Sequence, residues 1–226
     1  MFKIVLGCSH ERDPAQAVGT VIAHAMSGLA DTRAQAGILL NSGHKSDSTL
    51  LRAIHETWPS INLIGCAGPG HNDQPSLSLL LLNSPDLVFH VTSGALNQTP
   101  QAAAEHALST FMDQAHNLAL YLSLHDQSQP WPEDFVHAAT RLLPEQCACL
   151  EPLLPPVEKP WQMDRYYQGR EVTNERLPLL LASNRVNDAS GWRFTRQPGI
   201  VRKQHGEAVY EYDRLIGDRR RRQPAA

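Results

Sequence analysis

Short apolar runs alternate with stretches of helical periodicity in the first third of the chain, and this alternation constrains the fold more than any other feature. The runs at 2–8, 36–41 and 61–66 are predicted strands, and the stretches at 13–29 and 47–57 are predicted helices. Strands that alternate with helices are typical of a parallel sheet with crossover helices. The sequence therefore predicts an N-terminal parallel β-α-β-α-β unit.

Both predicted helices have boundary residues of the expected kind. Asp13 is expected to cap the first helix, because it stands directly before Pro14, and proline is favoured at the first helical position. Ser46 or Asp47 is expected to cap the second helix. That helix should end before Pro59, because a proline disfavours helical geometry in the residue that precedes it.

The pattern changes after residue 75. Two apolar runs at 76–82 and 86–91, separated by residues 83–85 with the sequence Asn-Ser-Pro, predict an antiparallel hairpin. A long helix is expected over 100–124, because apolar residues recur there at steps of three and four. We therefore predict an α/β fold with a mixed sheet, in which the N-terminal parallel unit is followed by antiparallel strands and a long helix.

The last third of the chain is predicted to return to short strands. A shorter helix is expected over 133–143, and four prolines make 147–160 an irregular connection. Strands are expected at 163–168, 176–183, 192–201 and 207–212, with turns at 168–170 and 204–206.

Composition and charge exclude several classes of protein. No apolar run approaches the ~20 residues needed to cross a membrane, and the run in 1–7 is too short for a secretory signal. The four cysteines have no disulfide-like spacing, which favours a reducing compartment, and we predict a cytoplasmic protein.

Residues 53–140 hold eight acidic residues and no Lys or Arg, which argues against a nucleic-acid surface because phosphate binding needs clustered cations. The dense basic run Arg219–Arg222 is expected to lie in a solvated tail.

The three strands of the predicted parallel unit end in turns rich in small residues. Ligands bind open parallel sheets at the carboxyl ends of the strands, where backbone amides and helix N-termini face an anion. We therefore predict a ligand-binding rim at this edge of the sheet. Its residues are Ser9, Ser42, Gly65, Cys66, Gly68 and Gly70.

Other interpretations of the same turns stay open. Glycine and serine suit turn geometry whatever a protein does, so these residues could be purely structural. His10, His44 and His71 occupy corresponding turns, and two of them could hold a metal ion or haem. Cys8 or Cys66 could be the nucleophile of a hydrolase or transferase, because a helix N-terminus lowers the pKa of a nearby thiol. The chain has no nucleophile elbow, phosphate-binding loop or His-Glu-x-x-His helix, and we predict that it is not an enzyme.

Several segments carry a resemblance to a known family. Their succession resembles the N-terminal domain of the FIST family of intracellular signal-transduction sensors, and the later ones are similar to the closing strands of that domain. The segments are 36–42, 58–66 with the glycine-rich loop that follows, 76–82, 166–172, 177–181 and 190–213.

The resemblance implies one FIST N-terminal-like sensory domain over 1–217 and a basic, disordered tail over 218–226. It implies a bacterial-type protein that binds a small ligand, an amino acid or similar metabolite, and haem serves as a nitric oxide sensor in some members of the family. The partner that it implies is a signalling protein, or a FIST C-terminal domain supplied by another chain. We expect a non-catalytic sensory domain in which ligand binding shifts the population of states presented to that partner.

Overall fold

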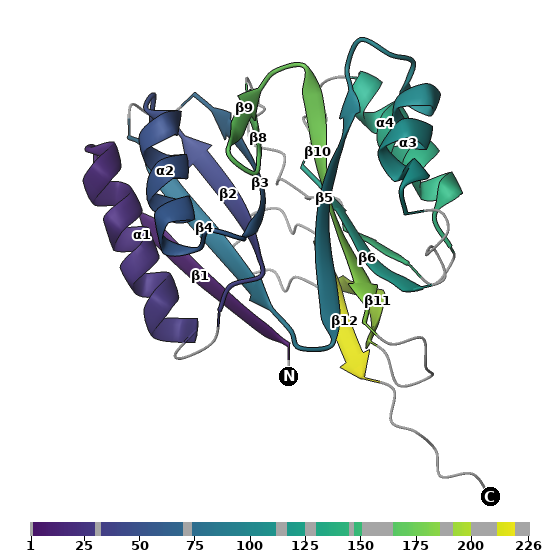
Figure 1. The fold of residues 1–226 in the computed structure, drawn as a ribbon, viewed down its shortest axis with the longest axis horizontal. Helices are drawn as coiled ribbons and strands as arrows, with labels where there is room; N and C mark the ends of the chain where they lie inside the picture. Colours follow the sequence, from purple (N-terminus) through teal and green to yellow (C-terminus); the bar gives the residue numbers. More distant parts are fainter. Residues whose placement is uncertain are drawn as a thin grey trace, which may run out of the picture.

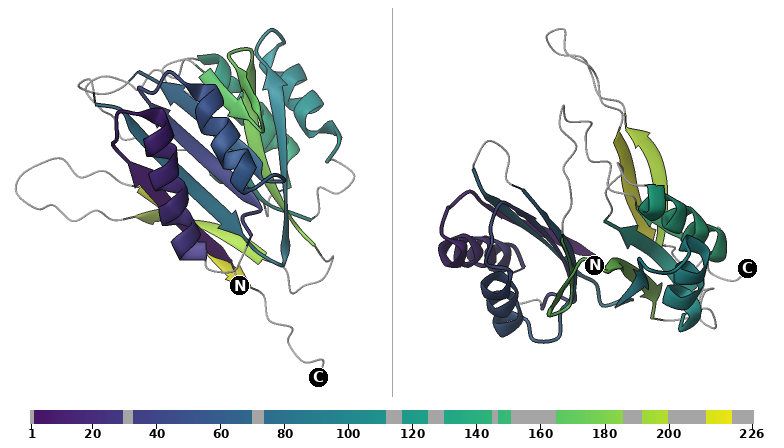
Figure 2. Two further views of the ribbon diagram at one scale, coloured as in Figure 1. Left: turned by 60° about the vertical axis from the view of Figure 1, so that its left-hand side comes forward. Right: turned by 90° about the horizontal axis from the view of Figure 1, so that it is seen from above.

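The computed structural model describes residues 2–29, 33–69, 74–111, 117–124, 130–144, 147–150, 165–185, 192–199 and 212–219. Two sheets stand face to face, and each carries a pair of helices on its outer side (Figure 1). The view from above shows the same layers in cross-section (Figure 2). The fold is α/β with a mixed sheet, as the sequence predicts.

The first sheet has the strand order β1-β4-β2-β3-β8-β9. In it β2 and β3 are parallel, and the other neighbours are antiparallel. In spatial order the strands are β1 (Lys3–Ser9), β4 (Ser76–Asn83), β2 (Ala36–Ser42), β3 (Asn62–Gly68), β8 (Arg165–Gln168) and β9 (Glu171–Thr173).

The position of β4 corrects the predicted parallel unit in one respect. β1 and β2 each pair antiparallel with β4, so they run in the same direction but are not neighbours. Leu77, Leu79 and Leu81 of β4 are fully buried in the apolar cluster under the helices. A leucine-rich strand suits a central position because both of its faces are covered there.

The second sheet has the strand order β5-β10-β6-β7. The predicted hairpin of 76–82 with 86–91 is wrong, because β4 and β5 belong to different sheets. The chain crosses between the sheets at Ser84, whose N–H donates to Gln35 Oε1 at 2.6 Å. The strands are β5 (Leu87–Ala95), β10 (Arg176–Asn184), β6 (Leu118–Ser123) and β7 (Ala148–Leu150).

The predicted long helix over 100–124 is also wrong. α3 (Pro100–Ser109) begins after Thr99, whose Oγ1 accepts the N–H of Ala102 at 3.3 Å. Residues 118–123 instead form β6, and every one of them is buried. An apolar run of this length fits a strand covered on both faces as well as it fits a buried helix.

The other helices lie close to their predicted positions. α1 (Pro14–Leu29) is capped by Asp13, whose Oδ1 accepts the N–H of Gln16 at 2.8 Å. α2 (Asp47–Thr57) follows Ser46, whose hydroxyl lies 2.9 Å from Thr49 Oγ1 and makes no capping bond to a backbone N–H. α4 (Pro130–Leu142) begins at residue 130, where 133 was expected.

The C-terminal third forms hairpins. β8 and β9 are joined by the predicted turn at 168–170, in which Gly169 has a φ of 57°, a conformation that favours glycine. β11 (Trp192–Gly199) pairs with β12 (Tyr212–Arg219), so the last strand lies later than the predicted 207–212. The predicted turn at 204–206 and the end of the predicted tail lie outside the described residues.

Two apolar clusters hold the layers together. One lies between α1, α2 and the first sheet, and the other joins the inner face of the first sheet to the second sheet, α3 and α4. In the described part of the chain, no helix is both long and apolar enough to cross a membrane.

Candidate functional site

The carboxyl ends of β1, β2 and β3 share one edge of the first sheet, as the sequence predicts. Ser42 Oγ donates to Pro69 O at 3.4 Å, and the N–H of Gly43 donates to Gly68 O at 2.9 Å. The turns after β2 and β3 are therefore in contact. Ser9 is buried at the end of β1, and β4 separates it from these turns.

Two predicted rim residues lie inside the packing of the sheet. A Cβ atom at Gly65 would stand 2.3 Å from a backbone oxygen of β2 and 2.8 Å from the ring of Tyr167, so its small size serves packing. Cys66 is fully buried between the two sheets. Gly70 and His71 lie outside the described residues.

Neither candidate thiol, Cys8 or Cys66, has the surroundings of a nucleophile among the described residues. Burial raises the pKa of Cys66 to about 12, and a thiol must ionise to act as a nucleophile. Cys8 is exposed, and its Sγ lies 3.4 Å from Ser78 Oγ. A serine hydroxyl is not a base that could activate a thiol.

Two of the three predicted metal or haem ligands, His10 and His44, lie in the described part of the chain. Over the residues that the structure describes, no group of three or more His, Cys, Asp and Glu is placed to hold a metal ion. His10 is exposed, whereas His44 is only 2% exposed, and its Nε2 has no hydrogen-bond partner in the described part of the chain. Burial lowers the pKa of His44, although the charge of Asp13 opposes this effect. The neutral imidazole is therefore favoured.

A partly buried polar network lies beside the rim. The carboxylate of Asp47 accepts the hydroxyl of Tyr167 at 2.5 Å and Asn41 Nδ2 at 3.2 Å, and its other oxygen pairs with Arg165 Nε at 2.8 Å. Burial and the hydrogen bond to Asp47 raise the pKa of Tyr167, so the phenol stays protonated. These polar groups form hydrogen bonds and an ion pair with one another, and these contacts join β2, α2 and β8. We therefore assign the network a structural role.

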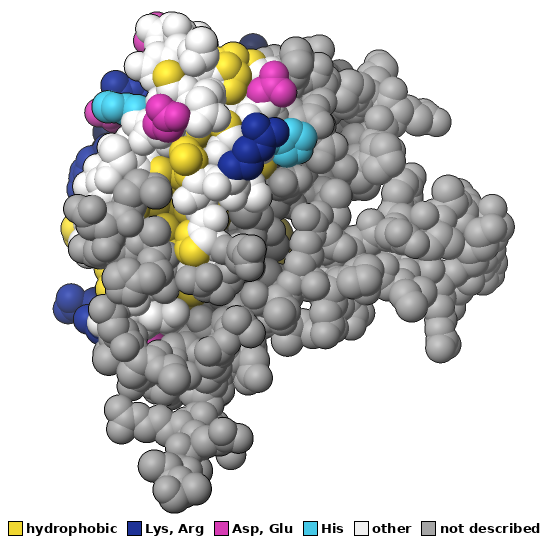
Figure 3. Space-filling view, turned by 90° about the vertical axis from the view of Figure 1, so that its right-hand side faces the viewer, with side chains coloured by type: hydrophobic (Ala, Val, Ile, Leu, Met, Phe, Trp, Pro, Cys, Tyr) yellow, Lys and Arg dark blue, Asp and Glu magenta, His cyan; other side chains and the backbone are white. Residues whose placement is uncertain are grey.

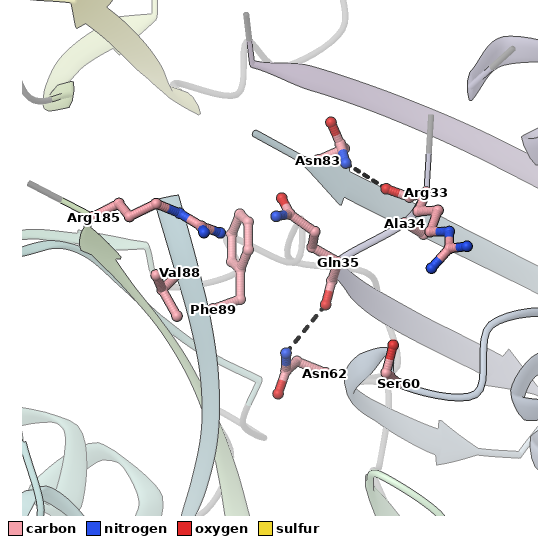
Figure 4. Close-up of a pocket in the computed structure, with 9 residues that line it drawn as sticks. All are labelled: Arg33, Ala34, Gln35, Ser60, Asn62, Asn83, Val88, Phe89 and Arg185. Atoms are coloured by element: carbon pink, nitrogen blue, oxygen red, sulfur yellow. Dashed lines mark hydrogen bonds between the residues drawn. The ribbon is translucent and has the colours of Figure 1, made fainter. Parts of the chain in front are cut away.

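A pocket opens at the opposite edge of the first sheet, at the amino ends of β2 and β3 (Figure 4). Its volume of about 300 Å³ is at the lower end of the range for small-molecule sites. Both sheets contribute to its walls. The lining residues are Arg33, Ala34, Gln35, Ser60, Asn62, Asn83, Val88, Phe89 and Arg185.

Hydrogen bonds hold three amide side chains at this pocket. Asn62 Nδ2 donates to the backbone oxygen of Gln35 at 3.2 Å, and Asn83 Nδ2 donates to the backbone oxygen of Arg33. Gln35 Oε1 accepts the N–H of Ser84 at 2.6 Å. Each asparagine therefore keeps its Oδ1 acceptor and one Nδ2 N–H for a ligand, and Gln35 keeps its Nε2 donors.

Two arginines from different sheets line the pocket. Arg33 precedes β2 of the first sheet, and Arg185 follows β10 of the second, with its side chain extending beside Phe89 (Figure 4). Both arginines are exposed, and within the described residues neither forms an ion pair. The described lining contains no acidic side chain, so the pocket is positively charged.

The pocket was missed by the sequence prediction because its residues are scattered along the chain. The rule that ligands bind at carboxyl ends of parallel strands directed attention to the other edge, and Asn83 was assigned to a hairpin turn. A weak signal was present in Gln35 and Asn62, which stand at the beginnings of two neighbouring apolar strands.

Comparison with known proteins gives structural likeness alone. No model of a known protein family matches the chain, and no curated protein matches it. A solved structure of cyanuric acid hydrolase is similar with a TM-score of 0.41 and 7% identity, over 88% of this chain and 72% of that one. A second, cyanuric acid hydrolase from A. caulinodans, has a TM-score of 0.40 and 8% identity over the same shares of the two chains.

These structures are those of an enzyme, and on that finding the prediction of a non-catalytic sensory domain is wrong. The likeness does not supply a replacement, because both TM-scores are below 0.5 and the identities are 7% and 8%. It therefore assigns neither the activity nor the substrate of that enzyme to this chain. The resemblance to the FIST family is not tested by these comparisons and stays a prediction.

Proposed function

We propose that this chain binds a small anionic molecule, of the carboxylate or phosphate class, in the pocket between its two sheets. The observation that carries the proposal is that Arg33 and Arg185, which belong to different sheets, both line one cavity of about 300 Å³ whose described lining has no acidic side chain. Guanidinium groups match carboxylates and phosphates in charge and in their paired hydrogen-bond geometry.

The amide side chains narrow the class of ligand. Asn62 and Asn83 each donate one Nδ2 N–H to a backbone oxygen, and this fixes the amide so that its Oδ1 atom can accept a hydrogen bond from a ligand. A hydroxyl or amino group beside the anionic group donates such a hydrogen bond. Hydroxy acids and amino acids therefore suit the pocket, and the latter are the class that the family resemblance implies.

Isothermal titration calorimetry tests the proposal directly. The panel contains malate, glutamate and inorganic phosphate, together with the diamide of malate, which keeps the hydroxyl and loses both charges. Arg33→Gln or Arg185→Gln should weaken binding of an anion about tenfold or more, because a hydrogen bond to a charged group contributes about 1.5–3 kcal/mol. Proton NMR of the same mixtures detects any conversion of a bound compound.

Arg52→Gln is the matched control, since Arg52 is an exposed arginine on α2 that does not line the pocket. It removes the same charge and should leave affinity unchanged. Equal binding of malate and its diamide, or equal weakening by all three substitutions, would contradict a specific anion site in this pocket.

We also propose a cytoplasmic location, which cell fractionation can check. Cys8, Cys66 and Cys147 are free thiols in the structure, and thiols stay reduced in the cytosol.

A further inference from the structure

β1 is the edge strand of the first sheet, and no described strand pairs with its outer edge. It pairs with β4 without a shift in register from Lys3 to Ser9. Apart from this pairing with β4, its backbone makes no hydrogen bond to another element within the described part of the chain. Edge strands are usually protected by a proline, a bulge or inward-pointing charges, and β1 has none of these after Lys3.

Exposed apolar side chains occur on both faces of this edge, on β1 and on α1. Ile4 and Leu6 of β1 are 57% and 58% exposed, and Met26 of α1 is 52% exposed. The other large hydrophobic side chain that is exposed in the described part of the chain is Val172, on β9 at the far edge of the same sheet. Ile4 and Leu6 lie together on the face of β1 turned away from α1, because Val5 and Gly7 face that helix, and neighbouring exposed apolar side chains are typical of an interaction surface.

The helix above β1 has no charge. α1 contains no Asp, Glu, Lys or Arg in its 16 residues, and the cores of protein interfaces are depleted in charged residues. The helix lies close to the strand, because Gly28 faces the side chain of Val5 and Gly7 faces the backbone of Val21. By contrast, charged, histidine and apolar side chains are interspersed over the described surface seen from the side of α3 and α4 (Figure 3).

We infer that a second copy of this chain covers the open edge, with the two β1 strands paired antiparallel about a twofold axis at Leu6. In this register Leu6 opposes Leu6 of the copy, and Ile4 opposes Cys8 of the copy, all on one face of the joined sheet. Lys3 opposes Ser9 of the copy, so the two lysines do not meet. An antiparallel strand edge is complementary to itself, as the interface of a twofold dimer must be.

The dimensions of the edge suit a small dimer interface. Its seven residues extend for about 24 Å, and a sheet with one helix layer is about 20 Å thick. The edge thus offers about 480 Å² per copy, and the two copies together approach the ~1,000 Å² expected of a specific interface. Since α1 covers β1 and β4, the helices of the two copies come about 10 Å apart, close to the usual distance between packed helices.

Light scattering coupled to size exclusion measures the mass of the purified chain at micromolar concentration. We expect a dimer. Leu6→Lys places two like charges beside each other at the twofold axis and should raise the dissociation constant about a hundredfold or more. Val172→Lys is the matched control, because it adds the same charge to the opposite edge of the sheet, and it should remain dimeric.

Cross-linking tests the register. Opposed residues of an antiparallel pair stand at a distance that a disulfide can span, so mild oxidation of the Ile4→Cys variant should join the introduced thiol of each copy to Cys8 of the other. Ile4→Cys combined with Cys8→Ser should not cross-link.

Since Leu6 is exposed, Leu6→Lys should keep the melting temperature of the folded monomer and the anion affinity of the pocket. A monomeric wild type, a dimer that persists in Leu6→Lys, or an edge occupied by a strand of a different protein would overturn the inference.

Discussion

At the scale of single residues, burial determines the chemistry of Cys66. Its side chain is fully buried in the cluster between the two sheets, and the loss of hydration raises its pKa from 9.0 to about 12. The thiol is therefore neutral in the folded protein over the physiological range. Cys66 acts as a small apolar side chain in this core.

This burial predicts a pH dependence of stability. Between pH 9 and 12 the unfolded chain loses the proton of Cys66 while the folded chain keeps it. The free energy of unfolding should therefore fall as the pH rises, by at most about 1.4 kcal/mol per pH unit from this group, and the contribution should be complete below pH 9. Urea unfolding at pH 7, 9 and 10 measures it.

Cys66→Ala should remove this part of the slope above pH 9, whereas Cys8→Ala, at an exposed thiol, should keep it. Equal pH slopes in wild type and Cys66→Ala would show that Cys66 ionises normally in the folded state.

At the scale of the elements, glycine sets the distance between α1 and β1. A Cβ atom at Gly7 would lie 2.3 Å from the backbone oxygen of Val21, which a side-chain rotation cannot relieve. Gly19 on the same helix has no atom within 4 Å of its Cβ position. A substitution at Gly7 therefore tests the packing of α1 on β1, whereas a substitution at Gly19 tests helix propensity alone.

Gly7→Ala should push the helix from the strand and lower the free energy of unfolding by about 1–3 kcal/mol. Gly19→Ala should raise it by about 0.5–1 kcal/mol, because alanine is the better helix former. Chemical denaturation of both variants at one protein concentration checks the pair. A Gly7→Ala variant as stable as wild type would mean that α1 does not lie this close to β1.

At the scale of the whole molecule, the two sheets share one apolar core. The cluster between them contains Ile38 and Ile64 from the first sheet and Leu179 and Leu181 from the second. Neither sheet can keep its inner face covered without the other. The layers are therefore expected to unfold together.

A single cooperative transition should appear in thermal or urea unfolding. Far-UV circular dichroism and tryptophan fluorescence should give the same midpoint, since Trp58 reports on the first sheet and Trp131 packs against the cluster around the second. Two separated transitions would show that the halves fold independently.

The candidate sites show which parts of a functional site can be predicted from the sequence. Ser42 and Gly68 were expected to meet at a rim, and they do, because β2 and β3 are parallel neighbours and their ends follow from that pairing. Gly65 and Cys66 were placed at the same rim, yet they lie inside the packing, since the sequence does not tell where a strand stops. The pocket of Arg33 and Arg185 could not be foreseen, because its walls belong to different sheets.

The sequence by itself determined the elements of the first 70 residues, because caps, prolines and side-chain periodicity are local signals that act within a few residues. Only the tertiary structure decided that β4 enters between β1 and β2, that the chain crosses to a second sheet at Ser84, and that 118–123 is a strand. Strand partners are chosen by hydrogen bonds and burial between distant segments. An apolar run in the sequence indicates that the segment is buried. Which segments bury it is determined by the rest of the fold.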